Sequence, residues 1–227
     1  MSNICIIPAR GGSKRIPRKN IKDFLGKPII SYAIENAINS NIFDRVIVST
    51  DDKEISEISK KYGAEVPFFR SEKNSDDYAS TIDVILETLS QIDTNYEIVC
   101  CLYPTTPLLS KQILLEAYER LISANYSAVF PVLKYSFPIQ RSLSLNKDGT
   151  CNMNWPENLN MRSQDLDPVY HDAGQFYFCK IKELHKHGTL YPPKSNCIVL
   201  KDIEAQDIDN DSDWNIAEIK FKLNNAK

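Results

Sequence analysis

The sequence contains only seven glycines, three histidines and two tryptophans, and it has no run of eighteen consecutive apolar residues. A helix that crosses a bilayer needs about 20 predominantly apolar residues, so no membrane span is expected. The apolar run at residues 4–7 is interrupted by Pro8 and Arg10, which is too early for the apolar segment of a signal peptide. We therefore expect a cytoplasmic protein without a membrane partner.

An excess of positive charge is also absent, because the formal net charge is −3. Nucleic-acid binding depends on a broad basic surface, so no nucleic-acid partner is expected. The six cysteines form neither a CxxC pair nor a Cys/His metal spacing, which predicts reduced thiols. His185 and His187 lack a third ligand nearby, and solvated side chains explain them better than a metal site.

Short apolar runs alternate with segments of helical periodicity along much of the chain. Strands are predicted at residues 3–8, 45–50, 97–103, 128–133 and 197–200. Helices are predicted at 29–38, between Asp51 as N-cap and Gly63, at 81–92, from Ser110, and after Asp211 or Ser212 as N-cap. This alternation indicates an α/β fold, a doubly wound and mostly parallel sheet in one domain over residues 1–227. Such sheets bind ligands at the carboxyl ends of their strands.

The alternation stops between residues 135 and 169. The turn signal NKDG at 146–149 and the pair Trp155-Pro156 predict hairpins or an excursion outside the main sheet. Phe137, Leu143, Leu145, Met153 and Trp155 make this inserted element too apolar for a linker. We expect it to pack on something, such as a second subunit.

The loop after the first predicted strand gathers five cations and two glycines without a carboxylate. Residues 6–20 read IIPARGGSKRIPRKN. Glycines at this position let backbone N–H groups point at an anion, and the cations favour a polyphosphate. The pattern is neither GxxxxGK[ST] nor GxGxxG, so a P-loop ATPase or a dinucleotide enzyme is not indicated. The alternative is a solvated turn whose cations keep the protein soluble.

Four stretches of this loop form a signature: Ala9-Arg10, Gly12-Ser13-Lys14, Ile16-Pro17 and Lys19-Asn20. It resembles the signature of the acylneuraminate cytidylyltransferases, which join a nine-carbon keto-acid sugar to CMP using CTP. The resemblance continues through residues 49–52, 104–108, 162–164 and 207–209. It implies a Rossmann-like nucleotidyltransferase in which the sugar's anomeric hydroxyl attacks the α-phosphorus of CTP and pyrophosphate leaves.

The resemblance implies a nucleotide site built mainly from this loop. Its implied nucleotide-binding residues are Ala9, Arg10, Gly12, Ser13, Lys14, Lys19, Asn20, Arg70 and Ser80. Because charge gathers on the leaving group, fixed cations such as Arg10 and Lys19 are expected to act in catalysis. Arg15 and Arg18 are better explained as solvated side chains. A surface position stays open for Arg70, as does helix capping for Ser80.

Asp207 and Asp209 stand two apart near the end of the sequence, and in an extended segment both carboxylates would lie on one face. The resemblance implies that they ligate Mg²⁺ and take part in catalysis, which suits a hard cation. The alternative is that acidic residues here precede a helix and cap it. Since Asp211 or Ser212 can supply the cap and Asp213 belongs to the helix, we favour metal ligation.

Within the family the chain most resembles the pseudaminic acid cytidylyltransferases, through residues 137–141, 162–166 and 170–177. Neuraminate enzymes usually carry Gln and Asn where this chain has Tyr103 and Ala173. Both positions face the sugar in the family, so the two departures argue against N-acetylneuraminate as the substrate. They do not affect the residues that are expected to bind CTP. Pseudaminic acid is therefore the expected sugar, with N-acetylneuraminate and legionaminate as alternatives.

The implied sugar pocket contains Tyr103, Arg162, Gln164, Tyr170, His171, Asp172 and Gln175. The planar fork of Arg162 suits the sugar carboxylate, although an Arg in a polar excursion is often a surface ion pair. His171 is a candidate general base for the anomeric hydroxyl, unless that hydroxyl is activated by a metal or otherwise. Family members are commonly homodimers in which the excursion closes the partner's sugar pocket, so Arg162 is a candidate to act across the interface.

Two other functions fit some of these residues. In a glycosyltransferase, residues 207–209 would be a DxD metal motif, but such a motif normally lies mid-domain and needs no triphosphate loop. A nucleotide sensor would keep the fold without turnover, but retention of both aspartates argues against it. Because fold alone does not settle function, these alternatives are separated by measuring pyrophosphate release.

Overall fold

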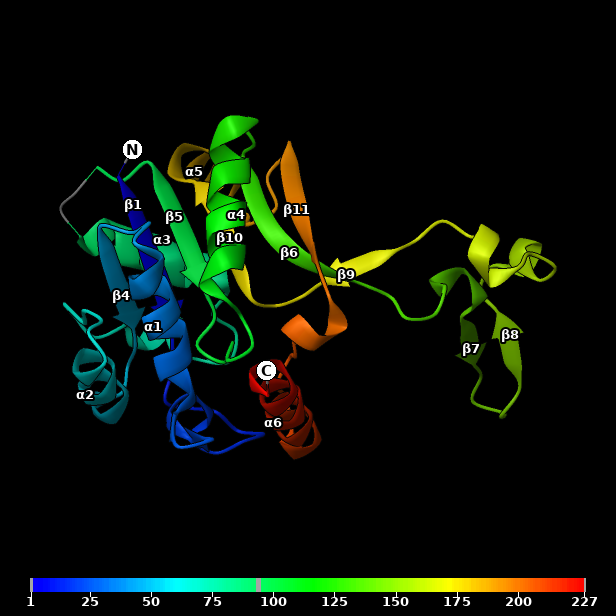
Figure 1. The fold of residues 1–227 in the computed structure, drawn as a ribbon, viewed down its shortest axis with the longest axis horizontal. Helices are drawn as coiled ribbons and strands as arrows, with labels where there is room; N and C mark the ends of the chain where they lie inside the picture. Colours follow the sequence, from blue (N-terminus) through cyan, green and yellow to red (C-terminus); the bar gives the residue numbers. More distant parts are fainter. Residues whose placement is uncertain (1, 93–94, 227) are drawn as a thin grey trace.

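A computed structural model describes residues 2–92 and 95–226 of the chain. At its centre lies a sheet in the order β11-β6-β10-β5-β1-β4, with β9 also paired to β6 (Figure 1). The strands are β1 (Asn3–Pro8), β4 (Arg45–Ser49), β5 (Ile98–Leu102), β6 (Ala128–Lys134), β9 (Tyr170–Asp172), β10 (Phe176–Lys180) and β11 (Ser195–Leu200). β1 runs parallel to β4 and β5, and β11 runs parallel to β6. The predicted mostly parallel sheet is confirmed.

Helices cover both faces of this sheet, as expected for a doubly wound fold (Figure 1). α1 (Ile29–Ser40) and α4 (Lys111–Ser123) pack Ile34 and Leu114 into the core of one face. α3 (Thr81–Gln91) and α5 (Ile181–His187) pack Ile85 and Leu184 into the core of the other. α2 (Lys53–Lys61) adds Ile55 beside β4, and α6 (Asp211–Asn225) ends the described chain. None of the helices in residues 2–92 and 95–226 is long and apolar enough to cross a membrane.

Short elements complete the fold. Two small hairpins are formed by β2 (Asp23–Phe24) with β3 (Lys27–Pro28) and by β7 (Leu143–Leu145) with β8 (Cys151–Met153). The 3₁₀ helices are η1 (Lys19–Ile21), η2 (Glu72–Asn74), η3 (Ile139–Arg141), η4 (Pro156–Asn158), η5 (Ser163–Asp165) and η6 (Asp202–Glu204). All six cysteines are free thiols, in agreement with the sequence.

Two predicted helix caps are wrong. Asp52, not Asp51, caps α2 by accepting the N–H of Ile55 at 2.9 Å. Asn210, not Asp211 or Ser212, caps α6, and its side chain accepts the N–H of Asp213 at 3.0 Å. A side-chain oxygen one residue before the helix can reach the exposed N–H groups of the first turn. Asp211 and Ser212 lie inside α6, whereas Asp51 precedes the cap of α2 and instead accepts the N–H of Gly11.

An antiparallel strand in the middle of the sheet was not predicted from the sequence. β10 pairs antiparallel with both β5 and β6, and α5 follows it directly. β9 and β10 pair with successive parts of β6, and the chain between them passes through Gly174 with φ of 60°. Glycine adopts this left-handed conformation without the steric cost that a Cβ brings. The interruption between β9 and β10 at Gly174 therefore turns the backbone at the edge of the sheet where ligands are expected.

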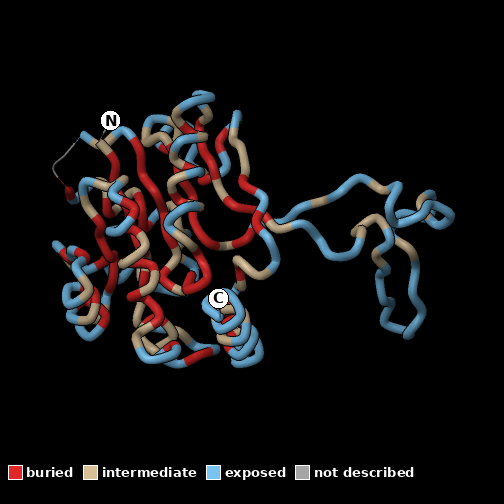
Figure 2. The backbone as a smooth tube through the Cα atoms, in the orientation of Figure 1, coloured by how far each residue is buried: buried red, intermediate tan, exposed pale blue. Residues whose placement is uncertain are grey.

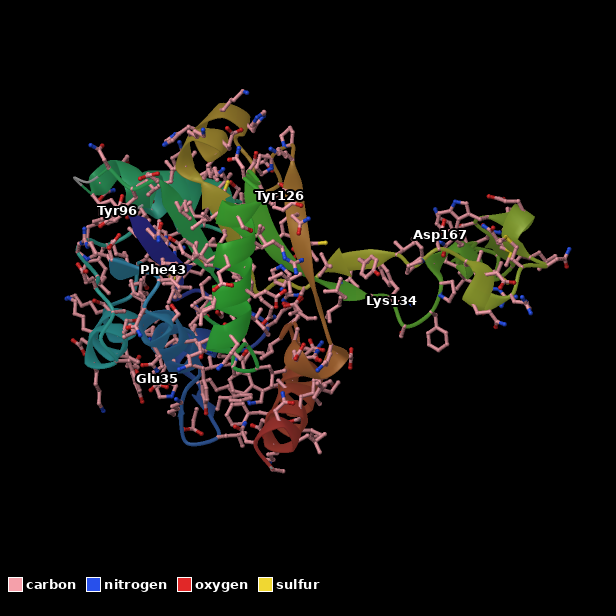
Figure 3. All side chains as sticks on the ribbon, turned by 45° about the horizontal axis from the view of Figure 1, so that its top comes forward. Glu35, Phe43, Tyr96, Tyr126, Lys134 and Asp167 are labelled. Carbon is pink, nitrogen blue, oxygen red and sulfur yellow. The ribbon has the colours of Figure 1, made fainter. Side chains whose placement is uncertain are left out.

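Residues 135–169 form an arm that projects away from the rest of the molecule (Figure 1). Lys134 marks the point where it leaves β6 in Figure 3. Almost the whole arm is exposed in Figure 2, and Phe137 and Leu145 are 81% and 78% exposed. The expected packing partner of this apolar segment is therefore not the body of the same chain.

Candidate active site

A cavity of about 370 Å³ lies at the carboxyl ends of β1 and β5. Three parts of the sequence contribute most of its wall: the first loop, the segment before α3, and the turn after β5. The lining residues include Arg10, Ser13, Lys14, Arg15, Lys19, Asn20, Arg70, Asp76, Asp77, Thr81, Tyr103, Gly174 and Asp207. This is the edge at which parallel α/β sheets bind ligands.

A small apolar cluster brings the two ends of the chain together at this cavity. Ile16 and Phe24 from the first loop region are buried against Ile208 and Trp214 from the last segment. Phe24 and Trp214 meet edge to face, with ring centroids 5.5 Å apart. Burial of these side chains is favourable by roughly 1.5–3 kcal/mol each, which is enough to fix the last segment against the loop.

The charged side chains on either side of this cluster meet directly. The Nζ of Lys19 donates to the carbonyl of Ile208 at 2.6 Å and lies 4.0 Å from Asp209 Oδ1. Arg15 lies 2.7 Å from the same Asp209 oxygen and also lines the cavity. The Arg15 side chain is 70% exposed, as predicted for a solvated side chain, but its guanidinium also pairs with Asp209.

The first loop is held against the turn that follows β4. Ala9 is buried, and its N–H donates to the Ser49 carbonyl at 2.9 Å. The Gly11 N–H donates to Asp51 Oδ1 at 2.8 Å, and Arg18 holds Asp52 through NH2 at 3.0 Å. Arg18 is thus an anchor of the loop rather than a purely solvated cation. These contacts fix the loop at both ends.

Within the loop, the glycines differ in the space around them. A Cβ on Gly11 would lie 2.8 Å from Asp52 Oδ2, whereas a Cβ on Gly12 would meet no atom within 4 Å among the described residues. Asn20 is buried and donates from Nδ2 to the Arg10 carbonyl at 2.9 Å. Gly11 therefore allows the loop to approach Asp52 closely, and the open space at Gly12 leaves the backbone there accessible to a ligand.

Asp207 and Asp209 have the chemistry that a hard divalent cation requires. Burial, followed by the neighbouring Asp209 carboxylate, raises the pKa of Asp207, so two acidic groups share one partly buried place. No group of three or more His, Cys, Asp or Glu residues in the described ranges could hold a metal alone. Mg²⁺ is commonly bound by one or two carboxylates together with substrate phosphates, so this pair fits that ion.

Lys19 is the most buried cation of the loop. Burial lowers its pKa, whereas Asp209 and Asp207 act in the opposite direction. Arg70 is buried too; its Nε donates to Ser49 Oγ at 3.1 Å, and burial lowers its pKa. Arginine stays protonated even so, which places two fixed positive charges beside the cavity. The surface position left open for Arg70 is therefore excluded.

Ser80 does not line the cavity. It is exposed and caps α3, accepting the N–H of Asp83 at 3.2 Å, while its neighbours Ala79 and Thr81 face the cavity. The capping interpretation of Ser80 is confirmed. Its side-chain oxygen satisfies one of the free N–H groups of the helix start.

The predicted sugar residues fall into two groups. Tyr103 lines the cavity, and its hydroxyl lies 3.2 Å from Thr81 Oγ1. Asp172 accepts hydrogen bonds from the hydroxyls of Tyr177 and Tyr191, the latter at 2.7 Å. Asp172 therefore belongs to an aromatic cluster that adjoins Tyr103, since the Tyr103 and Tyr177 rings meet edge to face at 5.7 Å.

The remaining body candidates lie on β9 and at its end. His171 packs on Tyr135 with ring centroids 4.8 Å apart, and its Nδ1 lies 2.9 Å from the Asp172 carbonyl. Tyr170 is exposed beside them. Gln175 is buried; its Nε2 donates to the Ala173 carbonyl at 3.0 Å, and its Oε1 has no hydrogen-bond partner within residues 2–92 and 95–226. None of these three side chains lines the cavity.

Arg162 and Gln164 are carried by the arm. Arg162 pairs with Asp165 at 2.7 Å. Neither Arg162 nor Gln164 lines the cavity of its own chain. The structure therefore does not bring them to the other candidates. Sequence reasoning also missed Asp77 and Tyr191, because ordinary surface and core patterns surround them and no local motif marks them. Tyr177 lies in the stretch 170–177 that carries the resemblance, but it was not singled out as a site residue.

Comparison with known proteins agrees with this geometry. Residues 4–175 match the family model described as Cytidylyltransferase. The chain is 49% identical over 227 residues to a pseudaminic acid cytidylyltransferase of Campylobacter jejuni subsp. jejuni serotype O:2, covering 99% of this chain and 98% of that one. It is 30% identical over 236 residues to a CMP-N,N'-diacetyllegionaminic acid synthase of Legionella pneumophila, with the same coverage.

The fold is shared with a solved structure of CMP:2-keto-3-deoxy-manno-octonic acid synthetase complexed with CTP. The two chains superpose with a TM-score of 0.71 at 15% identity, covering 100% of each. The resemblance seen in the loop signature is thus confirmed over nearly the whole chain. The cation-lined cavity, the match over residues 4–175 and the full-length relatives lead to one conclusion: the chain is an enzyme that belongs to the cytidylyltransferase family.

Proposed function

We propose that this enzyme transfers CMP from CTP to the anomeric hydroxyl of pseudaminic acid, a nine-carbon acid sugar, and releases pyrophosphate. The observation that supports this most is that Arg15 and Lys19, which line the cavity, meet Asp209, while Asp207 lines the same cavity. The 49% identity to a full-length relative of that name supports the sugar, whereas the legionaminic relative stands at 30%. Tyr103 and Ala173, which depart from the neuraminate pattern, support the same choice.

Both substrates are anions, so the site must offset charge before and during the transfer. Arg10, Ser13 and Lys14 hold the triphosphate from one side, and Lys19 approaches it from the side of Asp209. Fixed cations stabilise the charge that develops on the leaving pyrophosphate without reorganising. Asp207 and Asp209 would hold Mg²⁺, which when bound offsets further charge on the phosphates.

The base of the nucleotide lies toward Arg70, the most buried cation of the cavity wall. The sugar lies toward Tyr103 and Gly174, beyond which Asp172 and Gln175 support the wall. This order places the anomeric hydroxyl between the aromatic side of the cavity and the α-phosphorus. His171 remains a candidate base for that hydroxyl, acting from the root of the arm.

We also propose that the enzyme is a homodimer in which each arm covers the partner's cavity. Phe137, Leu143 and Leu145 are exposed on an arm that projects away from its own body, and a stable dimer would remove such side chains from water. Arg162 would then face the acidic sugar in the other subunit. The six free thiols suit the reducing cytoplasm, where we place the reaction.

The proposal is tested by incubating the protein with CTP, Mg²⁺ and, separately, pseudaminic, legionaminic, N-acetylneuraminic and Kdo acids. We expect the CMP conjugate of pseudaminic acid by mass, with stoichiometric pyrophosphate. Preference for another acid would correct the sugar. CTP binding without any product would indicate a nucleotide sensor, and sugar transfer from a CMP-sugar without pyrophosphate would indicate a glycosyltransferase.

A further inference from the structure

Asp77 holds two of the cations that the proposed function assigns to the triphosphate. Arg10 NH1 lies 2.8 Å from Asp77 Oδ1, and the Lys14 ammonium contacts Oδ2 of the same carboxylate. Arg10 NH1 also donates to the Asp76 carbonyl at 2.9 Å. A single carboxylate thus bridges both cations at the cavity wall, in the way that a phosphate group would.

The position of Asp77 is set by its neighbours. The Asp76 carboxylate accepts the N–H groups of Tyr78 and Ala79 at 2.8 and 2.7 Å, which fixes the turn that carries Asp77. Asn74, anchored through Nδ2 to Glu87 at 2.9 Å, begins the same stretch of cavity wall. Asp77 therefore faces the loop because the backbone is held there.

The ion pairs are partly exposed, since the Asp77 side chain is 41% exposed and that of Lys14 is 77% exposed. Lys14 and Arg10 hold the pKa of Asp77 below its usual range, so it is a carboxylate at neutral pH. Exposed pairs of this kind are weak and screened by salt. A polyphosphate with several charges can therefore replace Asp77, whereas a small anion with fewer charges competes poorly.

We propose that Asp77 is a specificity-determining residue of the nucleotide site: it competes with phosphate groups for Arg10 and Lys14 and so disfavours weakly charged anions. The same competition acts after the reaction. When pyrophosphate leaves, Asp77 returns to the two cations, which lowers the affinity of the site for this product. The inference rests on the proposed function for the identity of the ligand, but the contacts that carry it are those of the protein alone.

Isothermal titration with pyrophosphate, with and without Mg²⁺, tests this role. Asp77→Asn keeps the shape of the side chain and removes its charge, and Glu119→Gln on the outer surface of α4 removes one charge elsewhere. We expect the Kd of pyrophosphate to fall about fivefold in Asp77→Asn and to stay unchanged in Glu119→Gln. The gain should shrink at high salt, and inorganic phosphate should become a stronger inhibitor.

An unchanged or higher Kd in Asp77→Asn would overturn the inference, because the carboxylate would then be neutral toward the phosphates or would assist them. Thermal unfolding of both variants verifies that they fold alike. The titration needs no sugar, so the result stands even when every acid sugar fails as a substrate. Conversely, turnover of pseudaminic acid with an unaltered pyrophosphate Kd would refute the role of Asp77 alone.

Discussion

The Arg15 guanidinium lies 2.7 Å from the Asp209 carboxylate, although the two residues come from opposite ends of the chain. Lys19 approaches the same carboxylate, and Ile16 packs with Ile208 beneath them. The acidic pair is therefore positioned by the loop whose cations it faces. Substitutions in the first loop or in the acidic pair should alter the whole site while leaving the sheet folded.

Asp209→Asn should abolish turnover without loss of fold. The substitution removes the charge that a divalent cation needs but keeps a side chain of the same size, and the adjoining cap of α6 is made by Asn210 and Asp213. We expect pyrophosphate release to drop by at least about 10²-fold, as when a group that stabilises developing charge is removed. Asp211→Asn is the matched control, because that carboxylate is 82% exposed and pairs with Lys22 rather than with the cations of the cavity. Equal loss in both variants would contradict a specific role for Asp209.

Lys19→Met should lower kcat/KM for CTP by about 10²-fold, because the fixed charge nearest the acidic pair is lost. Met keeps most of the aliphatic stem that lies in the partly buried site. Lys53→Met removes the same charge from an exposed residue of α2 that does not line the cavity, and it should leave the rate unchanged. Steady-state kinetics over a range of CTP concentrations provide the measurement. A Lys19→Met enzyme with wild-type kinetics would remove this residue from the mechanism.

Gly11→Ala should destabilise the protein, whereas Gly12→Ala should not. The added Cβ at Gly11 would lie 2.8 Å from Asp52 Oδ2, and that carboxylate cannot easily retreat because it caps α2 and holds Arg18. Such overpacking typically costs about 1–3 kcal/mol. At Gly12 no described atom lies within 4 Å of the new Cβ. Thermal unfolding of the two variants compares them directly, and an equal Tm would show that the loop adapts freely.

Asp52 should make stability depend on acidic pH. Arg18 holds the pKa of Asp52 below its ordinary value of 3.8, so the folded state favours the ionised carboxylate. A lowered folded-state pKa gives stability that is present above pH 3.8 and lost as the pH falls through the lower value. Asp52→Asn, which can still cap α2, should therefore be less stable by about 1 kcal/mol at pH 7. In chemical denaturation the difference should shrink as the pH falls below 3.8 and through the lowered pKa of Asp52. A difference that stays constant over this acidic range would refute the ionic contribution.

Mixed dimers should reveal whether Arg162 acts in the partner's site. In a dimer of one Asp209→Asn chain and one Arg162→Ala chain, a shared site restores one complete cavity: the second chain supplies Asp209 and the first supplies Arg162. Each variant alone should be inactive or nearly so. Differently tagged chains, purified together and assayed for pyrophosphate release, test this. Stable mixed dimers that remain inactive would place Arg162 outside the partner's cavity.

Much of the sheet could be predicted, because apolar runs such as residues 3–8 and 97–103 are continuous and the helices between them are periodic. β10 was missed because a strand of five residues directly followed by a short helix leaves no alternating pattern. An antiparallel strand amid parallel ones is set by tertiary packing against β5 and β6, which local sequence does not encode.

From the sequence, the site could be predicted only where its charged residues stand close together along the chain. The cations of the first loop stand close together in the sequence, so their excess was visible. Their partners could not be found in the same way, since Asp77 and Asp52 reach the loop through the fold. The partner of Arg15 was missed for the same reason, because Asp209 lies almost at the other end of the chain.

The way the arm joins the sheet affects how this enzyme can change during evolution. The Tyr135 N–H donates to the Val169 carbonyl at 3.0 Å, so the insert begins and ends at one place on the sheet. Because its ends are already joined, lengthening or exchanging it adds little closure entropy. Evolution can therefore remodel the insert while the nucleotide machinery stays intact, and a transplanted insert from a relative would graft onto the body at these two residues.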